Sequence, residues 1–306
     1  MTDRRVSVII PTYRPDDKFR KLIARLSCQS LAPCEIIVVN TEEKYFPEDA
    51  TEGAENIRVI HIRREEFDHG GTRDMAARQA QGDLLCFMTM DAVPANEKLL
   101  EKLADAFDDE QVAAAYARQL PAEDCRLLER YTRAFNYPAK DKKKTAKDMD
   151  SMGIKTFFCS NVCAMYRRDI YLSEGGFEKR TIFNEDMIFA GKLIGKGYAV
   201  QYCAGAEVIH SHNYSGREQF HRNFDLGVSQ AEHADLFGMV SSENEGIRMV
   251  KKEARWLLKK GRIDQIAVLV YQSGCKYLGY RLGKRYASLP RHLVLMCTMN
   301  KAYWNR

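Results

Sequence analysis

Short apolar runs alternate with helix-like patterns over the first 120 residues, and no other feature restricts the fold as much. The apolar runs, which are typical of buried strands, occupy residues 6–10, 35–39, 57–62, 84–88 and 112–116. Patterns with the helical period lie between them, at 16–30, 72–81 and 96–107. Strands that alternate with helices predict an α/β fold with a mostly parallel central sheet that helices cover on both faces.

The alternation ends near residue 120. The charged stretch at 141–147 is low in hydrophobicity and predicts a loop. A helix is expected over 183–197, with Asn184 as its N-cap. Two short strands are expected at 199–203 and 206–210.

From about residue 217 the pattern is helical to the end. We therefore predict one domain over 1–215, with halves at about 1–120 and 121–215, followed by a helical region over 216–306.

Composition excludes several classes of protein. With 45% hydrophobic and 29% charged residues, the chain is typical of a globular protein. None of its nine cysteines has the spacing of a zinc site or of a disulfide framework, which favours reduced thiols inside a cell. The N-terminal apolar run is too short for a secretory signal, and no run has the length of a membrane-spanning helix.

The charge is divided unevenly along the chain. Residues 246–306 hold fourteen lysines and arginines against Glu253 and Asp264, whereas the whole chain has a net charge of +5. An acidic body therefore carries a basic tail, which suits an anionic partner. No nucleic-acid-binding motif accompanies this charge, so nucleic acid is not the expected partner.

Residues 246–262 predict a basic amphipathic helix. Ile247, Val250, Ala254, Leu257 and Leu258 share one face of it. Such a helix suits the surface of an anionic membrane, and aromatic residues that favour the interface accompany it: Trp256, Tyr271, Tyr277, Tyr280 and Tyr286. We expect peripheral association with the cytoplasmic face of the cell membrane. The alternative is that the apolar face packs on the rest of the protein.

Asp91 follows the fourth predicted strand, at the sheet edge where ligands of open α/β sheets bind. It holds a metal, contacts a phosphate-bearing substrate, or caps the next helix. Asn96 is the better-placed cap. His210 and His212 are two residues apart, so on a strand both point to one face. These three side chains are therefore a candidate metal site, although single histidines more often have structural roles.

The stretch His69–Asp74 opens the helix predicted at 72–81. Its two glycines allow a ligand to approach the backbone, and free N–H groups at a helix N-terminus bind phosphate. Arg73 is placed to add a bidentate contact, and Asp68 either contacts the nucleotide or caps the turn. A tight turn with Arg73 at the surface is an equally good interpretation. The chain lacks the glycine-rich dinucleotide fingerprint after its first strand.

Taken together, these motifs resemble those of the family-2 glycosyltransferases, which have the GT-A type of nucleotide-sugar-binding fold. The matching segments are "PTY", "IIVVN", "GGTRDMAARQAQGDLLCFMTMDAVP" and "NEDMIFAGKLIGKG", in the order and spacing of the family. The resemblance covers roughly residues 5–215. The strings "EEFDHGGTRDMAA", "YARQLP" and "FNYP" are most similar to rhamnosyltransferases of bacterial polysaccharide pathways.

The resemblance implies an inverting transfer in which a carboxylate takes the proton from the acceptor hydroxyl. The acidic pair of the family corresponds to Glu185 and Asp186, and Asp186 is the implied base. In the first turn of a helix, the dipole is expected to keep its carboxylate ionised.

The resemblance also implies which residues face the donor nucleotide, with 1–120 as the nucleotide-binding half and 121–215 as the acceptor half. The candidates are Thr12, Arg14, Asn40, Asp68, Arg73 and Asp91. Asn40 stands where the family usually has an aspartate, which accepts a hydrogen bond from a pyrimidine N3–H. The amide oxygen of asparagine can accept the same hydrogen bond. Tyr137 and Asn161 are candidates for contact with the donor sugar or the acceptor, with ordinary packing as the alternative for Tyr137.

Where the family has D-x-D, this chain has only Asp91. Mg²⁺ or Mn²⁺ is therefore expected on Asp91, His210 and His212, where it would bridge the diphosphate. The expected function is transfer of rhamnose from dTDP-rhamnose to a glycan acceptor. A lipid-linked acceptor would be consistent with a basic tail that binds the membrane. The alternatives are a sugar-1-phosphate nucleotidyltransferase, which would need a glycine-rich basic loop after the first strand, and a non-catalytic binding module.

Overall fold

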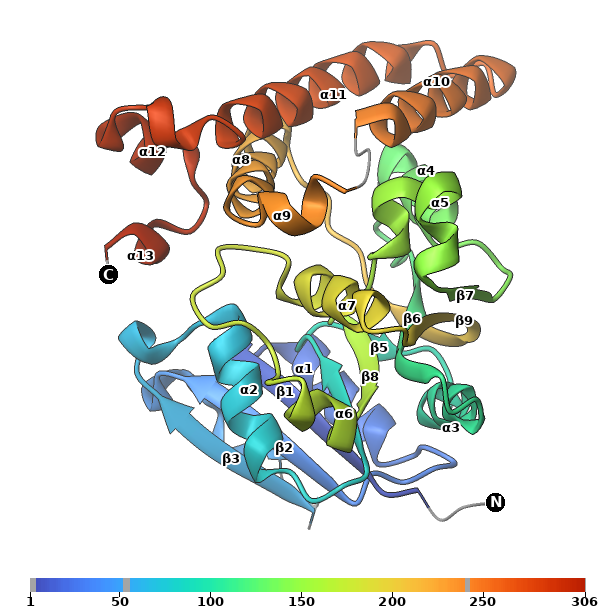
Figure 1. Ribbon diagram of the computed structural model, residues 1–306, viewed down its shortest axis with the longest axis vertical. Helices are drawn as coiled ribbons and strands as arrows, with labels where there is room; N and C mark the ends of the chain where they lie inside the picture. The colour runs from blue at the N-terminus through green and yellow to red at the C-terminus, as the bar shows by residue number, and fades with distance from the viewer. Residues whose placement is uncertain (1–3, 52–55, 240–242, 306) are drawn as a thin grey trace.

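The computed structural model describes residues 4–51, 56–239 and 243–305. One mixed sheet of nine strands lies at its centre, in the order β3-β2-β1-β4-β8-β6-β9-β5, with β7 paired to β9 (Figure 1). The first half of the sheet is parallel: β1 (Val6–Tyr13), β2 (Glu35–Thr41), β3 (Ile57–Ile62) and β4 (Leu84–Met88). The expected α/β fold with a parallel core is therefore confirmed.

The second half of the sheet mixes directions. It consists of β5 (Val93–Pro94), β6 (Val112–Leu120), β7 (Lys142–Lys144), β8 (Cys163–Arg167) and β9 (Ala199–Ile209). Strand β8 is antiparallel to both β4 and β6, whereas β6 and β9 are parallel. The short β5 pairs antiparallel to β9, with Val93 opposite Ile209. This last pairing brings the segment after β4 to the end of β9.

Helices cover both faces of the sheet, as expected, and each face has its own apolar core. One core includes α1 (Asp17–Leu26) and α3 (Leu99–Asp105). The other includes α2 (His69–Gln79), α6 (Arg168–Ser173) and α7 (Glu185–Gly195). Alternate residues of β1 divide between the cores, since Val8 and Ile10 face α1 and Ile9 faces α2. The apolar runs of the sequence are continuous because these strands are buried on both sides.

Three sequence-based expectations about local structure were wrong. Strand β1 continues through Pro11 to Tyr13, because β4 pairs with β1 only as far as Ile9 and the missing N–H of proline breaks no bond to it. The two short strands expected at 199–203 and 206–210 are the single strand β9, which has a register shift opposite Ala117 and Arg118.

The stretch expected to be a loop contains β7, which pairs with β9 and buries Lys144. The ammonium group donates to the carbonyls of Lys155 and Phe158 and lies 4.6 Å from the centre of the Tyr116 ring. Burial lowers the Lys144 pKa to about 7. Charge-based reasoning missed this strand because a lysine can be buried when carbonyls and an aromatic face replace water.

The C-terminal region is helical, as expected, and lies across one end of the sheet domain (Figure 1). Its helices are α8 (Gly216–Glu232), α9 (Ala234–Phe237), α10 (Glu243–Lys259), α11 (Asp264–Gly283), α12 (Arg291–Cys297) and α13 (Lys301–Trp304). Two shorter helices, α4 (Leu127–Asn136) and α5 (Met149–Met152), lie between the two parts, and Leu128 of α4 packs against Leu257 and Leu269. Among the described residues, none of the helices has the length and hydrophobicity needed to span a membrane.

Candidate functional site

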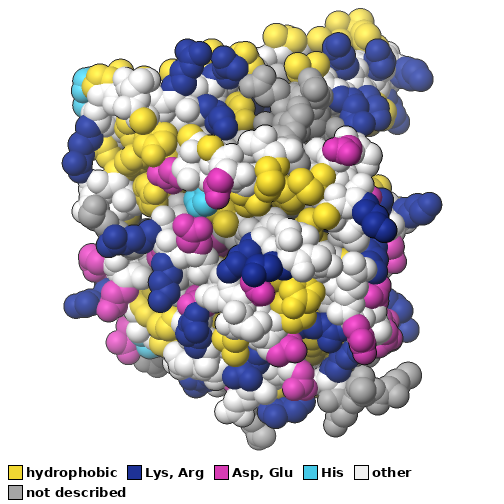
Figure 2. Space-filling view, viewed as in Figure 1, with side chains coloured by type: hydrophobic (Ala, Val, Ile, Leu, Met, Phe, Trp, Pro, Cys, Tyr) yellow, Lys and Arg dark blue, Asp and Glu magenta, His cyan; other side chains and the backbone are white. Residues whose placement is uncertain are grey.

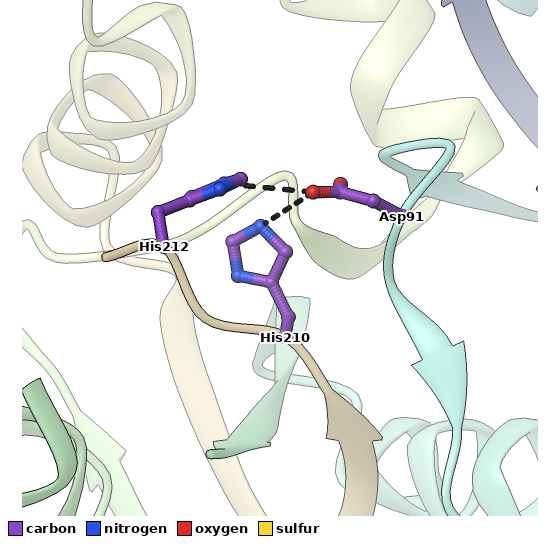
Figure 3. A group of neighbouring side chains, drawn as sticks. All are labelled: Asp91, His210 and His212. Carbon is purple, nitrogen blue, oxygen red and sulfur yellow. Dashed lines mark ion pairs between the residues drawn. The ribbon is translucent and has the colours of Figure 1, made fainter. Parts of the chain in front are cut away.

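Asp91 and two histidines meet at one edge of the sheet. Asp91 lies between β4 and β5, while His210 and His212 follow the end of β9. Because β5 and β9 are antiparallel, with Val93 opposite Ile209, continuing that register puts Asp91 beside both histidines. Figure 3 shows the three side chains converging, with both rings turned toward the carboxylate. The histidines lie just beyond the strand rather than on it, yet they share a target as the sequence predicted.

The geometry of this group suits a metal ion. Oδ2 of Asp91 lies 3.6 Å from Nε2 of His210 and 3.5 Å from Nε2 of His212, and one ligand atom from each residue falls within 4.8 Å of the others. Burial lowers the pKa of His210 to about 3 and also lowers that of His212, despite the attraction of Asp91. Both imidazoles are therefore neutral at pH 7, which is the form that binds metal.

His210 is also held in the orientation that a metal ligand needs. Its Nδ1 lies 3.1 Å from Oε1 of Gln119, an amide oxygen that can only accept, so Nδ1 carries the proton and Nε2 faces Asp91. Gln119 is itself fixed by Arg133 and by Ser160. Sequence reasoning missed Gln119, whose only signal was its position near the end of a strand.

Asp91 does not cap a helix. Asn96, the expected cap, accepts from the backbone N–H of Lys98 at 2.9 Å but does not cap α3, which begins only at Leu99 with Lys98 in the N-cap position and no side-chain capping bond. The Asp91 side chain is 20% exposed and has the two histidines as its ion-pair partners among the described residues. One carboxylate and two neutral imidazoles, open on one side, form a donor set that accommodates a divalent ion.

A second polar cluster lies at the start of α7. Glu185 is buried and its carboxylate forms an ion pair of 3.2 Å with Arg73 of α2. Asn161 donates through its side chain to Glu185 at 3.3 Å and through its backbone to Asp186 at 2.9 Å. The hydroxyl of Tyr166 fixes the Asn161 oxygen at 2.9 Å. Asn161, predicted to contact sugar, thus positions the acidic pair.

Asp186 does not have the electrostatics expected from its helix. Burial, followed by the charge of Glu185, raises its pKa to about 7, and backbone N–H groups of Asn161 and Met187 only partly offset this. The expectation that the helix dipole keeps this carboxylate ionised does not account for the raised pKa, because desolvation outweighs the dipole. A pKa near 7 is that of an efficient general base at neutral pH.

Asn184 holds the predicted position before α7 but does not cap it by the predicted contact. Its backbone is left-handed, with φ of 66°, and its side chain makes no capping hydrogen bond. Its amide donates instead to Oγ of Ser229 in α8 at 3.4 Å. The residue therefore links the acidic pair to the C-terminal region.

Of the candidates for the nucleotide side, Thr12 and Asn40 lie at the ends of adjacent strands. Thr12 donates to the amide oxygen of Asn40 at 3.2 Å, and the amide nitrogen of Asn40 donates to the carbonyl of Glu42. Asn40 is fully buried. It holds the strand ends together here, and its direct hydrogen bond to a pyrimidine stays a prediction.

Arg14, Asp68 and Arg73 lie in different surroundings. Arg14 is exposed, with a positive φ of 51° and its guanidinium 4.2 Å from the centre of the Tyr45 ring. Asp68 caps α2 by accepting from the backbone of Gly71 at 2.7 Å, which was the alternative interpretation for it. Arg73 is buried on Glu185 rather than at the surface. A phosphate contact by Arg73 stays a prediction.

Tyr137 is buried. Its ring packs on Phe158 and Tyr202, and burial raises the pKa of its hydroxyl to about 12. This is the packing alternative, and contact with a sugar stays a prediction.

The comparisons with known proteins agree with one another. The Glycosyl transferase family 2 profile matches residues 7–173. The chain is 38% identical over 305 residues to the O-antigen chain rhamnosyltransferase RfbN of Salmonella typhimurium, covering 98% of this chain and 96% of that protein. It is 37% identical to the O-antigen chain rhamnosyltransferase WbaN of Salmonella anatum, covering 98% and 95%.

The fold is similar to that of a mannosyltransferase from Pyrobaculum calidifontis, whose structure was solved in complex with GDP-mannose and Mn²⁺. The TM-score is 0.59 at 15% identity, with 99% of this chain and 88% of that chain covered. At this identity the similarity concerns the fold alone.

Proposed function

Because this chain belongs to glycosyl transferase family 2, we propose that it transfers rhamnose from dTDP-rhamnose to a hydroxyl of a glycan acceptor in the synthesis of a surface polysaccharide. Two O-antigen chain rhamnosyltransferases of Salmonella match it over nearly their whole length. The observation that carries the proposal is the half-buried Asp186 at the start of α7, whose carboxylate is held by the backbone N–H groups of Asn161 and Met187 and has its pKa raised to about 7 by burial.

The proposed mechanism is a single displacement with inversion. Asp186 accepts the proton of the acceptor hydroxyl while the hydroxyl oxygen forms a bond to the anomeric carbon and the bond from that carbon to the diphosphate breaks. Asn161 and Met187 hold the Asp186 carboxylate through their backbone N–H groups. Arg73 neutralises Glu185, which keeps a second negative charge from suppressing ionisation of the base further.

We propose Mn²⁺ as the metal, held by Asp91, His210 and His212. Mg²⁺ prefers an all-oxygen shell, whereas two imidazoles suit a later and softer divalent ion. When bound, such an ion offsets the negative charge that develops on the departing diphosphate. The neutral imidazoles and the tautomer set by Gln119 are what this chain contributes.

The test is a transfer assay with dTDP-rhamnose and lipid-linked acceptors, in which release of dTDP is measured. Asp186→Asn should lower the rate by about 10²- to 10⁴-fold, the usual contribution of a general base, and should leave dTDP binding intact. Asp150→Asn, which changes an exposed aspartate of α5, is the matched control and should be fully active. Unchanged turnover by Asp186→Asn would remove the proposed base. Conversion of dTDP-rhamnose to dTTP and rhamnose 1-phosphate on addition of inorganic diphosphate, with no release of dTDP, would favour a nucleotidyltransferase.

We also propose that the protein lies at the cytoplasmic face of the membrane through its C-terminal helices. The predicted apolar stripe of α10 is largely used for packing, since Leu257 is buried against Leu128 and Leu269 while Ile247 and Leu258 remain exposed. The exposed apolar residues lie mostly on α11 and α12: Val268, Val270, Tyr271, Tyr277, Leu278, Leu282, Leu293 and Met296. Figure 2 shows hydrophobic and basic side chains together over this end of the molecule. Such a surface suits anionic lipid and a lipid-linked acceptor.

A further inference from the structure

Five of the last twenty described residues form most of one wall of a cavity at the edge of the sheet where β1 and β2 end. The cavity has a volume of about 500 Å³, which is within the range of small-ligand sites. Tyr13 and Thr41 contribute from the ends of β1 and β2, and Phe67, Asp68 and His69 contribute from the start of α2. The wall opposite comes from the C-terminal region: Glu232, Tyr286, Asn300, Ala302, Tyr303 and Trp304.

The C-terminal segment is fixed in this position by specific contacts. Asp225 of α8 is buried and accepts from the hydroxyl of Thr298 at 2.6 Å and from the backbone N–H groups of Met299 and Asn300 at 3.0 and 3.2 Å. The hydroxyl of Tyr303 donates to Glu232 at 2.9 Å. Because a buried carboxylate holds its backbone, this C-terminal segment is an ordered part of the cavity.

Aromatic rings dominate the wall. The Trp304 ring lies 5.5 Å from that of Tyr286 and 5.2 Å from that of Tyr303, between ring centres. Across the cavity, Tyr13 and Phe67 add two more rings. Rings on two sides of a cavity of this volume suit a flat heterocycle, because aromatic side chains stack on nucleobases. The cavity also adjoins the predicted nucleotide residues, since Tyr13 follows Thr12 and Thr41 follows Asn40.

We infer that the nucleobase of the donor binds in this cavity and that Trp304, from the C-terminal segment, forms part of its binding surface. The inference rests on the proposed function and deepens it: it makes the C-terminal region part of the donor site. Arg64 and Arg180, two exposed cations that line the same cavity, complement the negative charge of a nucleoside diphosphate. The predicted membrane face and the donor site thus share one structural unit.

Tryptophan fluorescence tests this directly, because the chain has only two tryptophans, Trp256 and Trp304. Trp256 packs on Tyr131, 5.1 Å between ring centres, and does not line the cavity. In Trp256→Phe, which keeps Trp304 as the reporter, dTDP should quench the fluorescence in a saturable way. In Trp304→Phe, where only Trp256 reports, dTDP should cause little change.

Affinity measurements separate a contact with the base from a general structural effect. By calorimetry with Mn²⁺ present, Trp304→Ala should bind dTDP at least about tenfold more weakly, equivalent to the loss of one stacking contact, yet bind inorganic diphosphate as the wild type does. Equal weakening toward both ligands would overturn the inference, as would wild-type affinity of Trp304→Ala for dTDP. In either case the proposed function would still hold if the wild type releases dTDP in the transfer assay and Asp186→Asn does not. Failure of the wild type to bind any nucleoside diphosphate would overturn both.

Discussion

Asp186 and Glu185 are neighbours in sequence, but their pKa values are shifted in opposite directions. Burial raises the pKa of Asp186 to about 7, whereas the pKa of Glu185 is lowered, because Arg73, His69 and Asn161 outweigh its own burial. Two adjacent carboxylates with pKa values driven apart are typical of sites in which one carries the proton and the other carries fixed charge. Sequence alone identified the pair but not the division of roles, since that division depends on Arg73 reaching it from α2.

The pKa of Asp186 predicts how the rate depends on pH. A base acts only when deprotonated, so kcat/KM should rise with pH and level off above about 7, falling about tenfold per unit below that value. The profile should be measured from pH 5.5 to 8.5 with saturating Mn²⁺. The exposed-site variant Asp150→Asn should keep the same profile. A rate that stays constant from pH 5.5 to 8.5 would contradict the assignment.

The residue types in the sequence were sufficient to predict the group of Asp91, His210 and His212, but not the residue that orients His210. The aspartate after a buried strand and the paired histidines were visible, and the structure brings them together. Gln119, which orients His210, was not visible, because its role depends on the pairing of β6 with β9. Which residues of other strands lie beside a side chain depends on the tertiary structure, so the local sequence does not indicate it.

Among the elements, α8 and α11 make an unusually close contact that depends on glycine. A Cβ atom on Gly279 would lie 2.2 Å from the carbonyl oxygen of Phe220, and one on Gly283 would lie 2.1 Å from that of Phe224. Backbone atoms cannot yield as flexible side chains do, so these glycines set the distance between the helices. The helix that carries much of the exposed apolar surface is thereby docked on the helix that anchors the C-terminal segment through Asp225.

Substitution of one of these glycines should loosen the helical region. Gly279→Ala is expected to lower the free energy of unfolding by about 1–3 kcal/mol, the usual cost of overpacking. Gly274→Ala is the matched control in the same helix, because no described atom beyond its own stretch of helix backbone lies within 4 Å of its added methyl group. It should raise helix stability by up to about 1 kcal/mol. Urea unfolding of both variants measures this, and equal stabilities would contradict the proposed close contact.

The elements also show where sequence patterns stop being informative. Strands β3 and β4 were predicted with their observed bounds. Every residue of β4 is buried, because both faces of a parallel core strand are apolar, whereas β3 lies at the edge of the sheet and exposes Arg58 and His61. Strand β7 was missed because its three residues are all lysine. Its formation depends on pairing with β9 and on carbonyls that receive Lys144, neither of which its own sequence indicates.

The alternation of strands and helices along the chain predicted the fold class. The uneven distribution of charge predicted a distinct C-terminal region. How that region meets the sheet domain was not predictable. The contact of the C-terminal segment with the cavity beside β1 and β2 joins residues nearly 300 positions apart. Only the tertiary structure shows it.

The exposed apolar and basic surface of α11 and α12 predicts binding to anionic membranes. The protein should sediment with vesicles that contain phosphatidylglycerol and much less with neutral ones, and salt should weaken the binding, since screening reduces attraction between charges. Replacing Tyr277 and Leu278 by serine should reduce binding without loss of folding, because both side chains are more than half exposed. Replacement of Arg63 and Arg64, which are exposed on the sheet domain, is the control. Equal sedimentation with neutral vesicles would contradict the prediction.

We expect Asp91, His210 and His212 to bind a divalent ion together with the diphosphate of the donor, and electron paramagnetic resonance of Mn²⁺ measures this binding. The six-line signal of free Mn²⁺ should fall on addition of protein, and fall further with dTDP. His212→Ala should bind Mn²⁺ at least about tenfold more weakly, while His292→Ala, which changes an exposed histidine of α12, should match the wild type. Equal Mn²⁺ affinity of His212→Ala and the wild type would exclude a metal site on these three residues.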